Sequence, residues 1–319
     1  MAEIVVTGMG LCTALGEDPV PAMATGGSGV KECADLANLP LRQVARIESV
    51  DLRPWLLRRK DKKLMARPSQ LALAAAGPAL RGWSGPTEPL GVFLGVGWEP
   101  GDGDDSEPAL VAAQVNGKVD VRAVAGRCRD LYPPLLPLKT LPNMALAHMS
   151  IHLGVHGENG AWTGRQAAGL VALRSAIWAV REGRVPAALV VAADSWTTQG
   201  AIKAWLSGVG SADQSPGEAG VALLIEPESS ASARGADIFA RLDLGVMPDA
   251  EEHPIEGHHG SLGVCAAADG LLSVSLAIAA RCACSVVRAQ DPGQPPVEVS
   301  IEVESCFACY PPQAQGVDA

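Results

Sequence analysis

Several residue types that mark other classes of protein are scarce in this chain of 319 residues. Aromatic residues make up 4% of it. The chain has 25 basic and 35 acidic residues, which gives a formal net charge of −10. Such a charge disfavours nucleic acids and anionic membranes as partners. Hydrophobic residues still make up 48% of the chain, which excludes a disordered protein and suffices for a large core.

Targeting and cofactor signals are missing as well. No apolar run is long enough to span a membrane, and the N-terminus, Met-Ala-Glu-Ile-Val-Val-Thr-Gly, lacks the basic and apolar regions of a signal peptide. No phosphate-binding loop or dinucleotide fingerprint is present, since Gly95-Val96-Gly97 lacks the third glycine and the later acid. We therefore expect a cytoplasmic protein without a cofactor.

The eight cysteines form no disulfide framework, which fits a reducing compartment. Cys306 and Cys309 make a single CxxC, for which a structural role is expected. Two groups of histidines have spacings seen in metal sites: His148, His152 and His156; and His258 with His259 near Glu252 and Glu256. Gly154 is predicted to end the first helix before His156, and the second group is expected to be a loop of solvated histidines. We expect no metal.

Apolar periodicity predicts strands alternating with helices along the whole chain. The predicted strands cover 4–7, 91–96, 161–163, 187–193, 220–225, 238–246 and an edge strand at 297–303, with a tight turn at 8–10. The predicted helices cover 69–80, 143–153, 167–180, 197–206 and 271–280, and a surface loop covers 99–108. This order indicates a layered α/β fold with mixed sheets. The Ser/Ala-rich stretch 229–235 is expected to divide residues 1–228 from a shorter half, 236–310.

Four segments, in this order and spacing, resemble the β-ketoacyl synthase family of fatty acid and polyketide assembly. They are Ile4–Gly10 with Leu15-Gly16, Met65–Ala76, Pro142–Gly157, and Thr163–Ser195. The resemblance covers about the first two-thirds of the chain. It implies the thiolase fold, with two related halves whose mixed sheets lie between helices, and places residues 236–310 in a shortened second half.

Gln166 stands where condensing members of the family carry their catalytic cysteine, within Gly164-Arg165-Gln166-Ala167-Ala168-Gly169. In the family this position opens a helix, whose N-terminus lowers the pKa of a thiol and offers N–H groups to an oxyanion. The amide of Gln166 is neutral and its lone pair is delocalised, so it cannot attack a thioester. We therefore expect no condensation and no catalytic residue in this chain.

Glutamine at this position resembles two variants of the family. One is the chain-length factor, a non-condensing subunit that pairs with an active synthase; the other is a decarboxylating synthase, which needs two histidines to stabilise an enolate. In the second half, only His258 and His259 are candidates for stabilising an enolate. Compared with the family, the stretch between its two histidine motifs is missing here. Residues 304–310 are what remains of the family's late gating loop.

The leading hypothesis is therefore a chain-length-factor-type subunit of polyketide or fatty acid synthesis. Its partner is an active synthase in a heterodimer, or a second copy in a homodimer, with pairing expected through 143–164. Acyl carrier protein is a further candidate partner, for which the basic stretch 58–63 is a candidate surface, although a solvated helix face is preferred. The alternatives are a scaffold or adaptor, for example in a secretion or assembly machine, and a malonyl-thioester decarboxylase.

Overall fold

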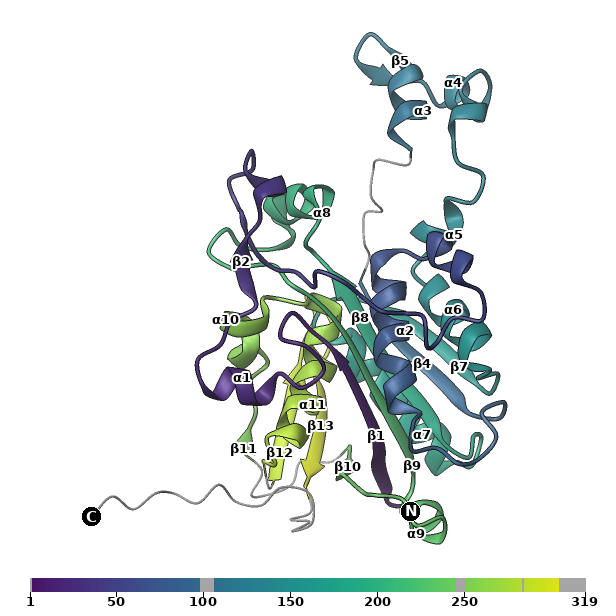
Figure 1. Ribbon diagram of the computed structural model, residues 1–319, viewed down its shortest axis with the longest axis vertical. Coiled ribbons are helices and arrows are strands. Elements are labelled where there is room, and N and C mark those ends of the chain that lie inside the picture. The colour runs from purple at the N-terminus through teal and green to yellow at the C-terminus, as the bar shows by residue number, and fades with distance from the viewer. Residues whose placement is uncertain (1, 98–105, 245–250, 283, 304–319) are drawn as a thin grey trace, which may run out of the picture.

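The computed structural model describes residues 2–97, 106–244, 251–282 and 284–303. Nine strands form one sheet in the order β11-β12-β13-β10-β1-β9-β8-β4-β7 (Figure 1). They are β1 (Ile4–Cys12), β4 (Gly91–Val96), β7 (Asn159–Thr163), β8 (Ala188–Ser195), β9 (Glu218–Pro227), β10 (Ala240–Asp243), β11 (Glu251–Glu252), β12 (Cys284–Ala289) and β13 (Val297–Glu302). Strand β4 is parallel to β7 and β8, and β11 to β12, whereas the other pairs are antiparallel. The predicted layered, mixed α/β architecture is confirmed.

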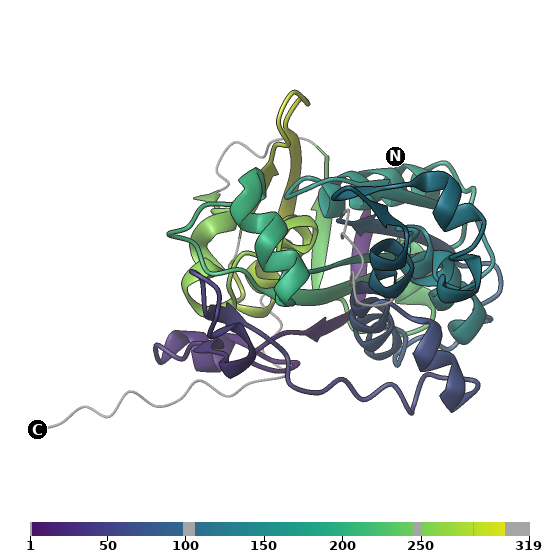
Figure 2. The ribbon, with the colours of Figure 1, turned by 90° about the horizontal axis from the view of Figure 1, so that it is seen from above.

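Helices cover both faces of the sheet (Figures 1 and 2). They are α1 (Val20–Ala24), α2 (Arg67–Ala79), α3 (Glu107–Ala112), α4 (Val121–Ala125), α5 (Pro137–Thr140), α6 (Met144–Leu153), α7 (Ala168–Arg181), α8 (Gln199–Ala204), α9 (Glu228–Ala233), α10 (His259–Leu262) and α11 (Asp269–Ala279). The side chains of α2 and α6 share one apolar cluster with β4 and β8, and those of α7 and α11 share another with strands from both ends of the sheet. None of these helices is long and apolar enough to cross a membrane.

Short elements complete the chain. Short 3₁₀ helices are η1 (Ala34–Leu36), η2 (Arg59–Leu64), η4 (Arg129–Leu131), η6 (Ile255–His258) and η7 (Ala266–Ala268), and η5 (Trp205–Val209) is a short π-helix. Two small hairpins pair β2 (Val30–Glu32) with β3 (Gln43–Ala45), and β5 (Gln114–Val115) with β6 (Lys118–Val119). Within residues 106–141, the part with α3, β5 and α4 protrudes from the body of the molecule at the top of Figure 1, whereas α5 lies beside α6.

The glycines near the N-terminus pack against a helix instead of forming the predicted turn. Strand β1 runs through Gly8 and Gly10 to Cys12, and a side chain at either glycine would meet α2. A Cβ atom at Gly8 would lie 2.0 Å from the carbonyl oxygen of Ala79, and one at Gly10 would lie 2.0 Å from that of Ala75. The turn prediction was wrong because glycine in a strand also marks close backbone approach.

Strand β13 is not the predicted edge strand, because it lies between β12 and β10. Its Val297, Val299 and Ile301 side chains are buried, whereas Glu302 is exposed. Alternation of apolar and charged residues indicates that one face of the strand is apolar. An inner antiparallel strand can have this pattern just as an edge strand can, so the pattern does not distinguish the two. Among the nine strands, β7 and β11 are the ones at the edges.

The sheet continues across the predicted division of the chain. Residues 228–233 form α9, and β10 pairs directly with β1. The division into 1–228 and 236–310 stays a prediction. Parts of three predicted segments, 98–105, 245–246 and 304–310 with its CxxC, lie outside the described residues, and Glu107 already begins α3 within the predicted loop.

Candidate functional site

Gln166 lies in the turn between β7 and α7, two residues before the helix begins, as the resemblance implied. Its side chain is half-buried, and its backbone carbonyl faces α11: a Cβ atom added at Gly270 would lie 2.5 Å from that oxygen. The N-termini of α7 and α11 therefore meet at Gln166. The resemblance noted from the sequence places the family's nucleophile at this position.

The backbone N–H groups on both sides of Gln166 are already bonded to a carboxylate. Arg165 N–H donates to Oδ2 of Asp291 at 2.8 Å, and Ala167 N–H donates to Oδ1 at 3.1 Å. Asp291 comes from the loop between β12 and β13. An anion generated at this turn would thus meet a negative charge, and the N–H groups of Arg165 and Ala167 are already occupied, which opposes oxyanion stabilisation.

Two cysteines, the buried Cys265 and the partly buried Cys12, have thiols that are unsuited to act as nucleophiles. Burial raises the pKa of the Cys265 thiol well above its usual range, with Asp269 adding to the effect, and raises that of Cys12 to about 12. The thiolate is the reactive form, so these groups are inert at neutral pH. The Cys265 thiol instead donates weak hydrogen bonds to the carbonyl oxygens of Leu262 and Gly263.

His258 and His259 converge on Asp269, the first residue of α11. His258 Nε2 lies 2.9 Å from Oδ1 in a buried hydrogen bond, and His259 Nε2 lies 3.3 Å from Oδ2. Burial alone would raise the pKa of Asp269, but the facing histidines outweigh it and the net pKa is lowered. The predicted neighbours Glu252 and Glu256 are exposed and are not part of this cluster.

The histidines of α6 are structural. His148 and His152 are buried with stacked rings, and burial lowers the pKa of both. Gly154 ends the helix in a left-handed conformation, as predicted, so the exposed His156 leaves the helix face. The three do not gather into a cluster of metal-ligating atoms.

Asp194 at the end of β8 joins the two parts of the fold. Its carboxylate accepts hydrogen bonds from Ser195 N–H at 2.9 Å, Trp196 Nε1 at 3.0 Å and Ala267 N–H at 3.2 Å. Burial raises the pKa of Asp194 to about 6, although these donors act in the opposite direction. Ala267 precedes α11, so this carboxylate helps to hold α11 in its place beside Gln166.

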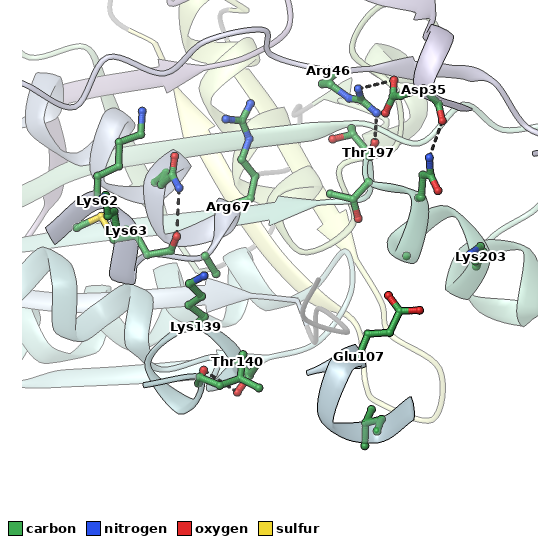
Figure 3. Close-up of a pocket in the computed structure, with 18 of the residues that line it drawn as sticks. Asp35, Arg46, Lys62, Lys63, Arg67, Glu107, Lys139, Thr140, Thr197 and Lys203 are labelled. Carbon is green, nitrogen blue, oxygen red and sulfur yellow. Dashed lines mark hydrogen bonds and ion pairs between the residues drawn. The ribbon is translucent and has the colours of Figure 1, made fainter. Parts of the chain in front are cut away.

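A cavity of about 1180 Å³ opens between the body and residues 106–141. Its lining contains six cationic side chains and three carboxylates. The cations are Arg46, Lys62, Lys63, Arg67, Lys139 and Lys203, and the carboxylates are Asp35, Glu48 and Glu107. Figure 3 shows Lys62, Arg67 and Lys139 on one side of the view and Lys203 from α8 on the other. The cavity is therefore basic although the protein as a whole is acidic.

Two of these cations are held in place by carboxylates. Arg46 binds Asp35 at 2.9 Å, and Arg67 binds the buried Glu218 at 2.6 Å. Glu218 also accepts hydrogen bonds from Ile47 N–H and the hydroxyls of Ser195 and Thr197. A network with every oxygen partnered fixes the wall of the cavity next to the end of β8.

Sequence reasoning found Gln166 and the histidine pair but missed their partners. Asp291 and Asp269 carried no motif that tied them to the site, although Asp291-Pro292-Gly293 is a turn signal. Of the cavity's cations only Lys62 and Lys63 lay in the basic stretch that was singled out. In that stretch Asp61 is buried and its five basic residues are exposed.

Comparison with solved structures finds proteins that share the fold of this chain. A crystal structure of a β-ketoacyl synthase from Burkholderia phymatum STM815 is 15% identical, covers 95% of this chain and 100% of its own, and has a TM-score of 0.76. The ishigamide ketosynthase/chain length factor is 18% identical, covers 94% and 99%, and has a TM-score of 0.71. The complex AntDE:AntF, a type II polyketide acyl-carrier protein with its ketosynthase bound to the hexaketide, is 14% identical, covers 95% and 100%, and has a TM-score of 0.71.

These identities show a shared fold, and the sequence itself shows the family. No curated protein sequence matches the chain significantly. The sequence model of the β-ketoacyl synthase N-terminal domain, however, matches residues 1–219, more than half of the chain. This chain therefore belongs to the β-ketoacyl synthase family.

Proposed function

We propose that this protein is a non-condensing subunit of the chain-length-factor type, which pairs with an active synthase in polyketide or fatty acid synthesis. The observation that carries the proposal is Gln166 at the start of α7, with Asp291 bonded to the N–H groups on both sides of it. An amide in place of a thiol, flanked by N–H groups that a carboxylate already occupies, supports a subunit that forms no acyl-enzyme at this position.

The edge of the sheet supports pairing with a second chain. Strand β7 is bonded to β4 on one side, and Asn159, Ala161 and Thr163 are exposed. Such an edge is a template for a further strand, and a two-fold axis beside it would join two sheets into one. Pairing there corresponds to the interface expected within 143–164.

Residues 106–141 add an apolar surface. Of the thirteen large hydrophobic side chains exposed in the described part of the chain, nine lie between residues 110 and 141. Val111, Val121 and Leu135 are 57%, 76% and 54% exposed. An apolar surface of this kind is typical of a protein interface, and the occupant that we propose is the partner synthase.

The basic cavity supports contact with an acidic carrier protein or its phosphate-bearing arm. Lys62 and Lys63 from the exposed stretch 58–63 line it together with Lys139 and Lys203. Because the chain as a whole carries a net charge of −10, a local excess of cations would direct a carrier to this region. This favours a binding role for the basic stretch over the solvated helix face that was preferred from the sequence.

The geometry gives less support to a decarboxylase. His258 Nε2 is bonded to Asp269, and His259 Nε2 is enclosed as well, so neither atom is presented to a thioester carbonyl. Decarboxylation needs a donor at that carbonyl, where negative charge develops. No specific contact favours a scaffold in a secretion or assembly machine.

Affinity capture from the native host tests the proposal. The tagged chain should recover, in equal amounts, a β-ketoacyl synthase that retains the catalytic cysteine. The Ala161→Lys variant should lose that partner, whereas Ala233→Lys, which changes an exposed alanine on α9, should retain it. Recovery of secretion or assembly components in place of a synthase would contradict the proposal and favour the scaffold.

A further inference from the structure

Three metal-ligating side chains come together beside α11. His258 ends η6, His259 begins α10, and Asp269 begins α11. One ligand atom from each of the three residues lies within 4.8 Å of the other two, and this is the one such group in the described residues. Two imidazoles and a carboxylate form a donor set that zinc and its neighbours in the first transition series prefer.

Hydrogen bonding within the cluster leaves two buried atoms without a hydrogen-bond partner. His258 Nε2 bonds Oδ1 of Asp269 at 2.9 Å, and Cys265 N–H donates to the same oxygen. His259 Nε2 and Oδ2 approach to 3.3 Å without hydrogen-bond geometry, and both atoms are buried with no other partner. Buried polar atoms are nearly always partnered, so this pair calls for a ligand that accepts both lone pairs.

We propose that His258, His259 and Asp269 bind a divalent transition-metal ion of the zinc class. Ligand atoms about 2.0–2.2 Å from a tetrahedral zinc ion lie roughly 3.3–3.5 Å from one another. The two nitrogen–oxygen distances of 2.9 and 3.3 Å are close to that edge, so small side-chain movements would seat the ion. The His259 side chain is 13% exposed although its Nε2 atom is buried, so the ion would enter by a movement of this side chain.

The ion would have a structural effect near Gln166. It would tie η6 and α10 to the first turn of α11, where the next residue, Gly270, packs against the backbone of Gln166. The Cys265 N–H bond to Asp269 already holds the carboxylate in place, as outer-shell bonds do in metal sites. The site lies wholly within one chain and does not depend on the proposed pairing.

Calorimetric titration of the chelator-treated protein with zinc chloride tests the site. One equivalent should bind, and zinc should raise the melting temperature. His259→Gln should weaken binding by about 100-fold or more, since even outer-shell changes cost 10–100-fold. His156→Gln, which alters an exposed histidine outside the cluster, should bind like the native chain. Absence of one-to-one binding, or unchanged binding by folded His259→Gln, would overturn the proposal.

Cobalt as a spectroscopic replacement covers the case in which the His259 variant does not fold. The native chain with one equivalent of cobalt should show the visible bands of a four-coordinate ion without thiolate charge transfer. All eight cysteines are present in that sample, so a thiolate band would assign the metal to cysteine and overturn the site. A spectrum of fully hydrated cobalt would overturn it too.

Discussion

The carboxylate of Asp291 lies 2.8 Å from the backbone N–H of Arg165, one residue before the position of the family's nucleophile. The contact joins residues 126 positions apart in the chain and brings the β12–β13 loop to the start of α7. A helix N-terminus attracts negative charge, and here the chain supplies that charge itself. The Asp291 carboxylate therefore occupies the backbone N–H groups on both sides of Gln166.

A cysteine introduced at position 166 should respond to the negative charge of Asp291. In Gln166→Cys the nearby Asp291 should disfavour the thiolate, and adding Asp291→Asn should raise the rate of alkylation by iodoacetamide at pH 7 by roughly tenfold, equivalent to about one pKa unit. Peptide mapping would follow position 166 separately from the native cysteines. Asp51→Asn, an exposed carboxylate paired with Arg53, is the matched control and should leave the rate unchanged. Equal rates with and without Asp291→Asn would contradict the contact.

The buried Asp194 should make stability depend on pH. Its pKa is about 6 in the fold and 3.8 in the reference state, so folding favours the protonated form. Its contribution is complete below about pH 4 and is lost as the pH rises through 6, by about 3 kcal/mol in all. When the pH is raised from 4 to 7, the unfolding free energy of the native chain in urea should therefore fall by about 3 kcal/mol relative to that of Asp194→Asn. A constant difference between the two proteins would contradict the raised pKa.

The contact of β1 with α2 should not tolerate a methyl group. Gly10→Ala would place a Cβ atom 2.0 Å from a helix carbonyl oxygen, so the strand or the helix must move, and a loss of about 2–4 kcal/mol in unfolding free energy is expected. Gly200→Ala on α8, where the nearest atom is 4.0 Å away, should be neutral or slightly stabilising. Similar urea midpoints for both variants would show that the packing is looser than described.

The edge strand β7 should mediate self-association or pairing. Lysine at Ala161 places a charge in the exposed row beside the free edge, which opposes addition of a strand. Sedimentation should show Ala161→Lys as a monomer at concentrations where the native chain or its complex is a dimer. Ala233→Lys should sediment like the native protein. If Ala161→Lys still pairs, the interface lies elsewhere, for example on residues 106–141 alone.

Sequence reasoning located most elements because their patterns are local. The helix after Gln166 and the helix at 143–153 were predicted within a residue or two, since apolar periodicity and the left-handed Gly154 are visible in a short window. Strand β12 was missed, and Gly8 and Gly10 were assigned to a turn. The role of those glycines is set by α2, which lies more than fifty residues later.

The site was predicted in part for the same reason. Gln166 follows from a local motif, but Asp291 reaches it only through the β12–β13 loop, and Asp269 reaches the histidines only because α11 begins beside them. The nearby Glu252 and Glu256 were the natural choice from the sequence, yet the structure leaves both exposed. Contacts across long sequence separations have no signature in a single chain.

The central claim is that this chain cannot carry an acyl group. Intact-mass spectrometry after incubation with an acyl carrier-protein thioester tests it most directly, with a cysteine-containing synthase in the same mixture as the positive control. The account predicts that the control gains the mass of the acyl group while this chain, with Gln166 unmodified, gains none. A stable acyl adduct mapped by peptide sequencing to residues 164–169 would contradict it.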